Sequence, residues 1–193
     1  MIELHSTFNT YHSTFLVSLT PMELIDVLTP DGEPTGIRKP KALVHRDGDW
    51  HRAAHIWIAT NDGRILLQRR SLQKENHPGL WDVSAAGHVS SGESVVDSAI
   101  REVGEELGLH IEPSELRHIA TIAESFVLND ATYFDNEFHE IFLVHRDIDL
   151  AKLKLQREEV DAVELVTPDQ LRARLHQMVP HGEEYNRLLA AIE

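Results

Sequence analysis

The sequence predicts an α/β sandwich in which helices cover both faces of a mixed β-sheet. Strand-like and helix-like segments alternate along the chain, and the 193 residues contain no internal repeat and no linker. A chain of this length can bury a sizeable core as one domain. We therefore expect residues 22–193 to form a single domain. Residues 1–21, a polar stretch rich in serine, threonine and histidine, are expected to be a flexible N-terminal extension.

The first half of the chain predicts paired strands. Residues 22–28 are expected to form a short strand, and the turn residues TPDGEPTG after it predict a hairpin that continues at Gly36. Residues 51–60 and 64–68 are strand-like and are separated by Asn-Asp-Gly, a strong hairpin signal. Residues 80–84 follow a His-Pro-Gly turn and lead into the motif described below.

The second half predicts further strands and two closing helices. Three segments are expected to be extended, namely residues 116–127, 137–146 and 160–166. Residues 129–136 are expected to be a polar connection. Pro168 opens a helix that runs over residues 169–176, and residues 183–192 form the last helix.

Composition excludes several functional classes. The formal charge of −14 argues against a nucleic-acid polymer as partner. The chain has no cysteine, which excludes disulfides, thiolate metal sites and cysteine nucleophiles and fits a reducing cytoplasm. No apolar run approaches the ~20 residues of a membrane span, and the first residues do not resemble a signal peptide. We expect a cytoplasmic protein without a membrane partner.

Residues 94–108 predict a helix with defined ends. Ser94 is a good N-cap, and Asp97 completes a capping-box pattern three residues later. Gly108 can adopt the left-handed conformation that ends a helix. An apolar stripe at helical spacing is expected to face the core, and its members are Val96, Ile100, Val103 and Leu107.

A second face of this helix carries Glu102, Glu105 and Glu106. Like charges three and four residues apart destabilise an isolated helix. A divalent cation would remove this repulsion, because Mg²⁺ prefers carboxylate oxygens, waters and substrate phosphates. The alternative interpretation is an acidic face that is simply solvated.

The helix is part of a longer motif that decides between these interpretations. Residues 87–109 read GHVSSGESVVDSAIREVGEELGL and match the pattern GX5EX7REUXEEXGU, with U a bulky aliphatic residue, at every position. This pattern is the Nudix box, so the chain resembles a Nudix hydrolase over roughly residues 22–175. The resemblance implies the Nudix fold, an α/β/α sandwich around a mixed sheet. It also implies Mg²⁺- or Mn²⁺-dependent cleavage of a diphosphate bond in a small molecule.

The resemblance also assigns roles within the box. Glu102, Glu105 and Glu106 would hold the metal ions, with the Gly87 carbonyl as an additional ligand. Glu93 and Arg101 would form an ion pair that anchors the loop to the helix. For the general base, Glu105 and Glu106 are the favoured residues and Glu137 is the alternative outside the box.

Outside the box, the chain is similar to the type 1 isopentenyl-diphosphate isomerases of the same superfamily. The similar segments are WHRAAHIWI, ILLQRRSLQK, HPGLWDVSAAGH and DNEFHEIF. The resemblance implies a second metal site, in which His45, His51 and His88 match the histidine ligands. Glu137 matches the metal-bound catalytic glutamate, and Asp135 falls on a second acidic ligand.

The chain departs from those isomerases at the cysteine that moves a proton. Ala86 occupies that position, and a methyl group cannot transfer the proton that allylic isomerisation requires. No tryptophan follows Trp81 that could stabilise a carbocation. The isomerases carry a degraded Nudix box, whereas the box here is intact. We interpret this as isomerase-like ancestry with hydrolase chemistry.

Basic residues after the second predicted strand of the core are expected to bind phosphate. Arg69, Arg70 and Lys74 match diphosphate-binding positions of the isomerases, and a solvated strand end is the alternative. Arginine binds phosphate through two donors, and lysine adds a point charge. Lys39 and Lys41 are additional phosphate contacts with weaker support.

The sequence does not identify the substrate. Five aromatic residues could stack on a base or line an apolar pocket, with Trp57 expected in the core: Trp50, Trp57, Trp81, Tyr133 and Phe134. Other histidines are expected to be surface or core residues without a ligand role, namely His55, His77, His110, His118 and His145.

Three functions therefore compete. They are a metal-dependent diphosphate hydrolase, an isopentenyl-diphosphate isomerase that uses a different acid, and a non-catalytic ligand-binding Nudix domain. The intact box favours the first. The resemblance leaves a homodimer open, because many Nudix enzymes dimerise.

Overall fold

The computed structural model describes residues 23–192, so the predicted extension over residues 1–21 lies outside the described residues. A small hairpin of β1 (Leu24–Leu28) and β2 (Pro34–Pro40) precedes helix α1 (Lys41–Asp47). The remaining strands are β3 (His51–Ala59), β4 (Ile65–Arg70), β5 (Trp81–Asp82), β6 (Ala85–His88), β7 (Arg117–Leu128), β8 (Tyr133–His145) and β9 (Val160–Val166). The remaining α-helices are α2 (Val95–Leu107), α3 (Pro168–Ala173) and α4 (Gly182–Ile192).

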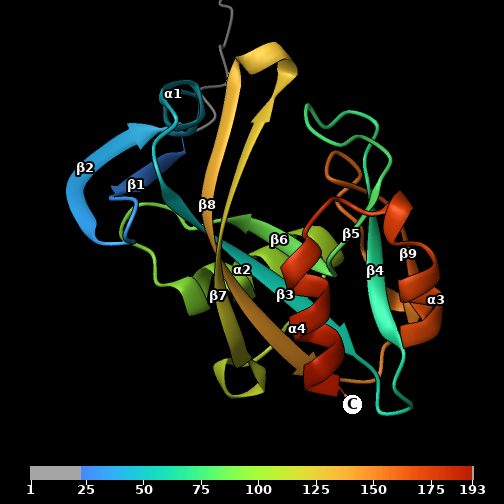
Figure 1. Cartoon of the computed structure of the whole chain (residues 1–193). Helices are drawn as coiled ribbons and strands as arrows, with labels where there is room; N and C mark the ends of the chain where they lie inside the picture. The colour runs from blue at the N-terminus through green and yellow to red at the C-terminus, as the bar shows by residue number, and fades with distance from the viewer. Residues whose placement is uncertain (1–22, 193) are drawn as a thin grey trace, which may run out of the picture.

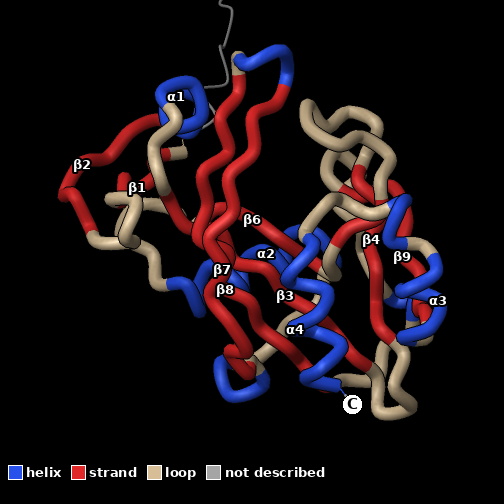
Figure 2. Tube along the Cα trace, viewed as in Figure 1, coloured by secondary structure: helices blue, strands red, loops and turns tan. Residues whose placement is uncertain are grey.

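The central sheet is mixed, which confirms the predicted fold class. Its main path runs β5-β4-β3-β8-β7, with β6 paired to β3 and β9 paired to β4. Strands β3 and β8 are parallel, while the other pairs are antiparallel. Helices α2 and α4 lie on opposite faces of this sheet (Figure 1). Figure 2 shows the same layering by secondary structure, with the β7–β8 hairpin extending beyond the helices.

Alternation along the strands builds a core on each face. Trp57 and Ile141 pack with Leu188 of α4, whereas Ile58 and Phe142 pack with Val103 of α2. Successive strand residues point to opposite faces, so one strand supplies both cores. Strand β3 is buried on both sides, which explains why residues 51–60 read as an almost continuous apolar run in the sequence.

The sheet opens between β3 and β4, and this opening positions the functional residues. The two strands pair only at Ile58–Leu66 and at the next residue pair, after which they separate. Strands β5 and β6 occupy the wedge, with β5 on β4 and β6 on β3. Ser84 joins the two sides, because its hydroxyl accepts from the Ile58 N–H at 2.8 Å and donates to the Leu66 carbonyl at 2.6 Å.

One local prediction was wrong, and one helix was missed. Residues 129–136 were expected to be a polar connection, but β8 begins at Tyr133, because these polar residues pair with β7 down to Tyr133–Leu128. Helix α1 was not predicted, since it follows Pro40 without a side-chain N-cap and has only seven residues. Within residues 23–192, no helix combines the length and apolar character needed to cross a membrane.

Candidate functional site

Helix α2 has the ends that its sequence predicts. The Ser94 hydroxyl accepts a hydrogen bond from the Asp97 N–H at 3.1 Å, and Gly108 ends the helix at φ 67°. Asp97 contacts the Ser94 hydroxyl rather than its backbone, so the capping box is incomplete. Val103 and Leu107 are fully buried, whereas Val96 and Ile100 lie at the margin of the core.

The glutamates of α2 divide into a buried pair and an exposed member. Glu102 and Glu106 are buried at 9% and 5% exposure, while the Glu105 side chain is 53% exposed. Glu106 Oε2 accepts from the Ala86 N–H and from Gln68 Nε2, both at 3.1 Å. The acidic face is therefore turned inward at two of its three positions and is not simply solvated.

Gly87 is required by the approach of Glu102. A Cβ at position 87 would lie 2.0 Å from Glu102 Oε1, a contact that real side chains do not make. The missing side chain lets the Glu102 carboxylate lie against the backbone of β6. The backbone of this strand thus forms a cradle for a carboxylate, next to the cavity described below.

Burial makes the charged forms of these two carboxylates unfavourable. Desolvation and the nearby Glu102 charge together raise the pKa of Glu106 to about 8. Desolvation also raises the pKa of Glu102, against the lowering effect of Arg101. Two buried carboxylates that both resist ionisation are a favourable environment for a hard cation, which would stabilise both charges.

Arg101 anchors the preceding loop to the helix. Its guanidinium donates to both oxygens of Glu93 at 3.0 Å, and its Nη2 donates to the His88 carbonyl at 3.1 Å. Nη1 reaches Glu102 at 2.5 Å and Glu105 at 3.2 Å. The pair predicted between Glu93 and Arg101 is therefore formed, and it also orients the glutamates.

The glutamates face a polar cavity of about 1210 Å³. A volume of this size accommodates a small-molecule substrate. Residues of both charges line it, and the basic ones are Arg38, Lys41, Arg70, Lys74 and Arg101. The β7–β8 hairpin and the loop that follows β4, which stand apart in Figure 1, both contribute lining residues, among them Phe126, Tyr133 and Lys74.

A cluster of histidines and carboxylates lies at the start of β3 and β8, and its members His88, Asp135 and Glu137 line the same cavity. The parallel register places His51 beside Glu137, and the antiparallel register places Ala53 beside His88. His51 Nε2 and His88 Nε2 lie 3.1 and 3.0 Å from Glu137 Oε1. His45 completes the group from α1, with its ring 4.8 Å from that of His51.

Charges in this cluster are coupled. Burial opposes ionisation of Glu137, but hydrogen bonds from His139 and His51 outweigh it and hold its pKa well below the usual range. The same bond to Glu137 raises the pKa of His51 despite burial. Burial and the Lys41 charge lower the pKa of His88 to about 3, so His88 is neutral and keeps a lone pair for a metal.

Several buried polar atoms in this cluster have no hydrogen-bond partner. They are His45 Nε2, His88 Nε2 and Asp135 Oδ1. His88 Nε2 is close to Glu137 but not aligned for a hydrogen bond, and His51 Nδ1 contacts the Asp49 carbonyl at 3.1 Å, leaving Nε2 for the cluster. Donor atoms of His45, His51, His88 and Asp135 lie within 4.8 Å of one another, so these residues fit a metal ion.

Comparison with protein families decides the identity of the fold. The NUDIX domain family matches residues 49–189, which is most of the chain. The chain belongs to the Nudix family. The match contains the box and the sheet around it, so the sequence resemblance to Nudix hydrolases is confirmed.

Two curated relatives represent the two branches that the sequence suggested. Nudix hydrolase 3 of Arabidopsis thaliana is 43% identical over 167 residues, covering 85% of this chain but only 22% of the plant protein. Isopentenyl-diphosphate Delta-isomerase of Clavibacter sepedonicus is 36% identical over 155 residues, covering 77% of this chain and 76% of that enzyme. This Nudix chain is therefore similar to proteins named for either activity.

Solved structures agree on the fold. The protein DR0079 of Deinococcus radiodurans has a TM-score of 0.63 at 22% identity, covering 80% of this chain and 89% of that one. A bifunctional NMN adenylyltransferase/ADP ribose pyrophosphatase of Francisella tularensis, complexed with AMP and a Mn ion, has a TM-score of 0.53 at 13% identity. It covers 73% of this chain and 40% of that one.

The predicted phosphate-binding residues of this Nudix chain separate into two groups. Arg70 and Lys74 line the cavity, where Arg70 pairs with Asp82 at 2.9 Å and Lys74 pairs with Glu159. Arg69 is not among the lining residues and instead pairs with Asp161 and lies over the Trp81 ring.

The two weaker phosphate candidates also separate. Lys41 lines the cavity, and its amine lies 3.5 Å from Glu23. Lys39 is not among the lining residues, because its amine is held by Asp47 at 3.0 Å and Asp49 at 2.5 Å.

The aromatic residues are similarly divided. Tyr133 lines the cavity and stacks on His45 with ring centroids 4.2 Å apart. Trp57 is fully buried in the core, as expected. Phe126 of β7 also lines the cavity, although the sequence analysis did not single it out.

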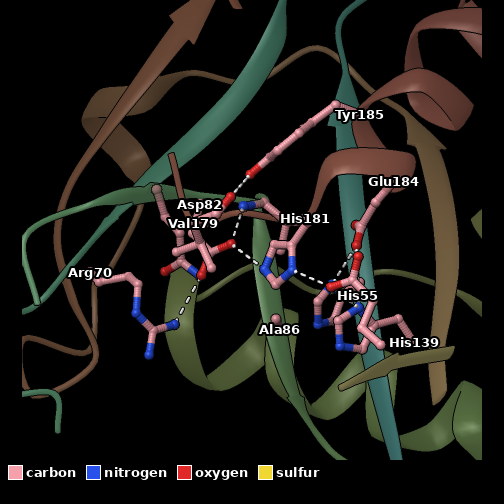
Figure 3. Close-up of polar contacts among 12 residues, drawn as sticks. His55, Arg70, Asp82, Ala86, His139, Val179, His181, Glu184 and Tyr185 are labelled. Carbon is pink, nitrogen blue, oxygen red and sulfur yellow. Dashed lines mark hydrogen bonds and ion pairs between the residues drawn. The ribbon is translucent and has the colours of Figure 1, made fainter. Parts of the chain in front are cut away.

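The sequence analysis missed a second group of buried histidines. His55, His139 and His181 converge with Glu184 on one side of the cavity (Figure 3). His55 had been expected to have no ligand role, and the other three had not been singled out. They come from β3, from β8 and from the start of α4, and no recognised motif spaces them. The main sequence signal was the alternation that places residues 51, 55, 137 and 139 on one face.

Proposed function

We propose that this Nudix chain is a Mg²⁺- or Mn²⁺-dependent hydrolase of a diphosphate bond. Its substrate would be a nucleoside diphosphate derivative or another small organic diphosphate. The observation that carries the proposal is the buried pair Glu102 and Glu106, placed beside the Gly87 cradle on a cavity lined by basic side chains. The Mn ion and AMP of the Francisella tularensis neighbour are consistent with this class of ligand.

The residues present fit a hard divalent cation. Glu102 and Glu106 would hold it, with the Gly87 carbonyl as a further oxygen ligand. When bound, a divalent cation supplies charge neutralisation on phosphate oxygens and a more acidic water. His45, His51 and His88 offer nitrogen ligands next to this site, and His88 lines the cavity, so a second cation of softer preference would be held there.

A proton must leave the attacking water. We assign this role to Glu105, because its carboxylate reaches solvent while the Glu106 carboxylate is buried and fixed by two donors. Arg101 orients the Glu105 side chain at 3.2 Å. Glu137 remains the alternative base, although three histidines surround its carboxylate.

Arg70 and Lys74 would bind the phosphates. Both line the cavity, and each is now neutralised by one carboxylate, Asp82 or Glu159. A diphosphate would share these cations with their present partners. Arg70 would bind phosphate through two donors, and Lys74 would add a charge without a fixed direction. Tyr133 and Phe126 supply aromatic surface for the remainder of the substrate.

The test is release of product from a panel of nucleoside diphosphate derivatives and prenyl diphosphates, with and without Mg²⁺. We expect cation-dependent cleavage that Glu106→Gln reduces by at least 100-fold, as is typical when an electrostatic group of this kind is removed. Ligand binding without turnover of any compound would contradict the proposal and favour the non-catalytic Nudix domain.

One observation keeps isomerisation of isopentenyl diphosphate as a second candidate. The five residues that match the isomerase metal site lie together: His45, His51, His88, Asp135 and Glu137. Ala86 faces the same cavity without a group that can move a proton, so another acid would have to supply it, for example the Tyr133 hydroxyl. Incorporation of deuterium from D₂O into isopentenyl diphosphate would support this activity. Absence of incorporation rules it out.

A further inference from the structure

A second histidine cluster lies apart from the Nudix glutamates. His55 of β3, His139 of β8, and His181 and Glu184 beside or within α4 are all buried. The rings of His55 and His139 stack with centroids 4.0 Å apart, and His181 lies edge-on to both. One donor atom from each of the four residues lies within 4.8 Å of the others. Figure 3 shows their side chains converging from these separate elements.

The partners of His139 leave one nitrogen free for a ligand. His139 Nε2 lies 2.9 Å from Glu137 Oε2 and donates to it. Its Nδ1 is buried and has no hydrogen bond, and lies 3.6 Å from Glu184 Oε2 and 3.7 Å from Glu124 Oε2. A metal-binding histidine usually donates its other ring N–H to a carboxylate, as His139 Nε2 does here, and a metal ion at Nδ1 would replace a proton bound there.

Two neighbouring side chains orient the Glu184 carboxylate. Its Oε1 accepts from Trp57 Nε1 at 2.7 Å, and its Oε2 lies 2.8 Å from His55 Nδ1. The carboxylate is completely buried, and Trp57 fixes its orientation toward the histidines. Such an outer partner restricts a carboxylate ligand to one position.

Carboxylates surround these rings on several sides. His181 Nδ1 lies 3.2 Å from Glu124, and its Nε2 lies 3.4 Å from Asp82, which is itself paired with Arg70. With Glu137 and Glu184, four buried or nearly buried carboxylates face three imidazoles. A dication would balance this negative charge without requiring every imidazole to be protonated.

We propose that His55, His139, His181 and Glu184 form a metal site for a borderline dication such as Zn²⁺ or Co²⁺. Three imidazoles and one carboxylate suit such an ion better than Mg²⁺. Donor atoms around tetrahedral zinc are ~3.4 Å apart, so side-chain shifts of about 1 Å close the site. His55, His139 and His181 also line the cavity, which gives an ion a path of entry.

The experiment isolates this site in the full-length chain. His51→Asn with His88→Asn removes two ligands of the isomerase-like cluster, and excess Mg²⁺ occupies the Nudix glutamates. Equilibrium dialysis then counts bound Co²⁺, and visible absorption reports its coordination by nitrogen. We expect one Co²⁺ per chain in this background, with binding weakened at least 10-fold by Glu184→Gln or by His181→Asn.

Glu183→Gln is the matched control. Glu183 is the neighbouring residue on α4, and its carboxylate is exposed and paired with Arg187 at 2.7 Å. Its removal is expected to leave Co²⁺ binding unchanged. Circular dichroism and thermal unfolding of each variant establish that the fold is retained.

A second readout needs no variant at the site. Zn²⁺ added to ¹⁵N-labelled protein should shift the ring-nitrogen resonances of His55, His139 and His181, with His139 coordinated through Nδ1. Unchanged resonances at saturating Zn²⁺, or one Co²⁺ bound equally in the Glu184→Gln and His181→Asn variants, would overturn the proposal. Neither readout depends on turnover, so failure here leaves the proposed hydrolase function untouched.

Discussion

At the scale of single residues, the proposed chemistry and a pH-dependent part of the stability both rest on the buried pair Glu102 and Glu106. Both carboxylates are buried, and Arg101 contacts Glu102 but not Glu106. The Lys74 charge favours ionised Glu106, but desolvation outweighs it. Glu106 relies on the Ala86 N–H and the Gln68 amide. These donors orient a carboxylate, but they do not compensate its charge.

Metal-free stability should therefore depend on pH through Glu106. Folding raises the pKa of Glu106 from 4.5 to about 8, so the folded chain keeps a proton that the unfolded chain releases. This contribution is present below about pH 4.5 and is lost as pH rises toward 8. In EDTA, Glu106→Gln should gain stability over wild type between pH 5 and 8.5, on the order of 2–4 kcal/mol. Urea unfolding of wild type and Glu106→Gln at pH 5 and at pH 8.5 measures the two differences in stability. A difference that does not change with pH would contradict the raised pKa of Glu106.

The roles of Glu105 and Glu106 can be separated. Glu105→Gln should lower kcat by 100-fold or more while Mn²⁺ affinity changes little, because we assign the exposed carboxylate to proton transfer. Glu106→Gln should lower both kcat and the affinity for Mn²⁺. Titration of Mn²⁺ by electron paramagnetic resonance supplies the affinity. Equal losses of affinity in the two variants would make Glu105 a ligand instead.

Single residues also show what the sequence could predict. The residues that the box singled out lie together in the structure, because they are close in sequence on one loop and one helix: Gly87, Glu93, Arg101, Glu102, Glu105 and Glu106. Their metal-binding and catalytic roles stay predictions. Arg69 and Lys39 were grouped with the phosphate ligands although they are not among the cavity-lining residues. Their partners, Asp161 for Arg69 and Asp47 with Asp49 for Lys39, are fixed by tertiary contacts that a linear motif does not encode.

At the scale of elements, the packing of α2 on β6 determines the geometry of the carboxylates. Gly87 should be intolerant of a side chain for that reason. Gly87→Ala places a methyl group 2.0 Å from Glu102 Oε1 and should displace that carboxylate. We expect at least a 10-fold loss of turnover and weaker Mg²⁺ binding with little change in secondary structure. Activity assays and circular dichroism check both points.

Gly182→Ala is the control for this substitution. Gly182 begins α4, and a Cβ there meets no atom within 4 Å. Turnover equal to wild type is expected. Full activity in Gly87→Ala would show that the approach of Glu102 to β6 is not needed for catalysis.

The elements themselves were predictable where local patterns dominate. The N-cap and C-cap of α2 and the extent of β9 agree with expectation. Helix α1 and the first residues of β8 were missed, because their structure depends on partners distant in the sequence. Tyr133 joins β8 because it pairs with Leu128 of β7. The polar composition of residues 129–136 does not reveal this pairing, so the segment was predicted as a connection.

At the scale of the whole molecule, one cavity collects groups from most elements of the fold. Strands β3 and β8, helix α2 and the segment before α4 each contribute, so cation binding should stabilise the entire domain. At a concentration of 100 times Kd, Mg²⁺ should add about 2.7 kcal/mol, which corresponds to a rise of roughly 5–11 °C in Tm. Calorimetry of wild type and of Glu102→Gln/Glu106→Gln measures this shift. A shift of equal size in the double variant would place the cation elsewhere.

The central claim is metal-dependent hydrolysis at the Nudix helix, and one measurement tests it most directly. Product release from the diphosphate panel is followed with Mg²⁺ for wild type, Glu106→Gln and the exposed-site control Glu183→Gln. We predict cleavage of at least one compound class by wild type and by the control, with a loss of at least 100-fold in Glu106→Gln. Cleavage that persists unchanged in Glu106→Gln would contradict the account.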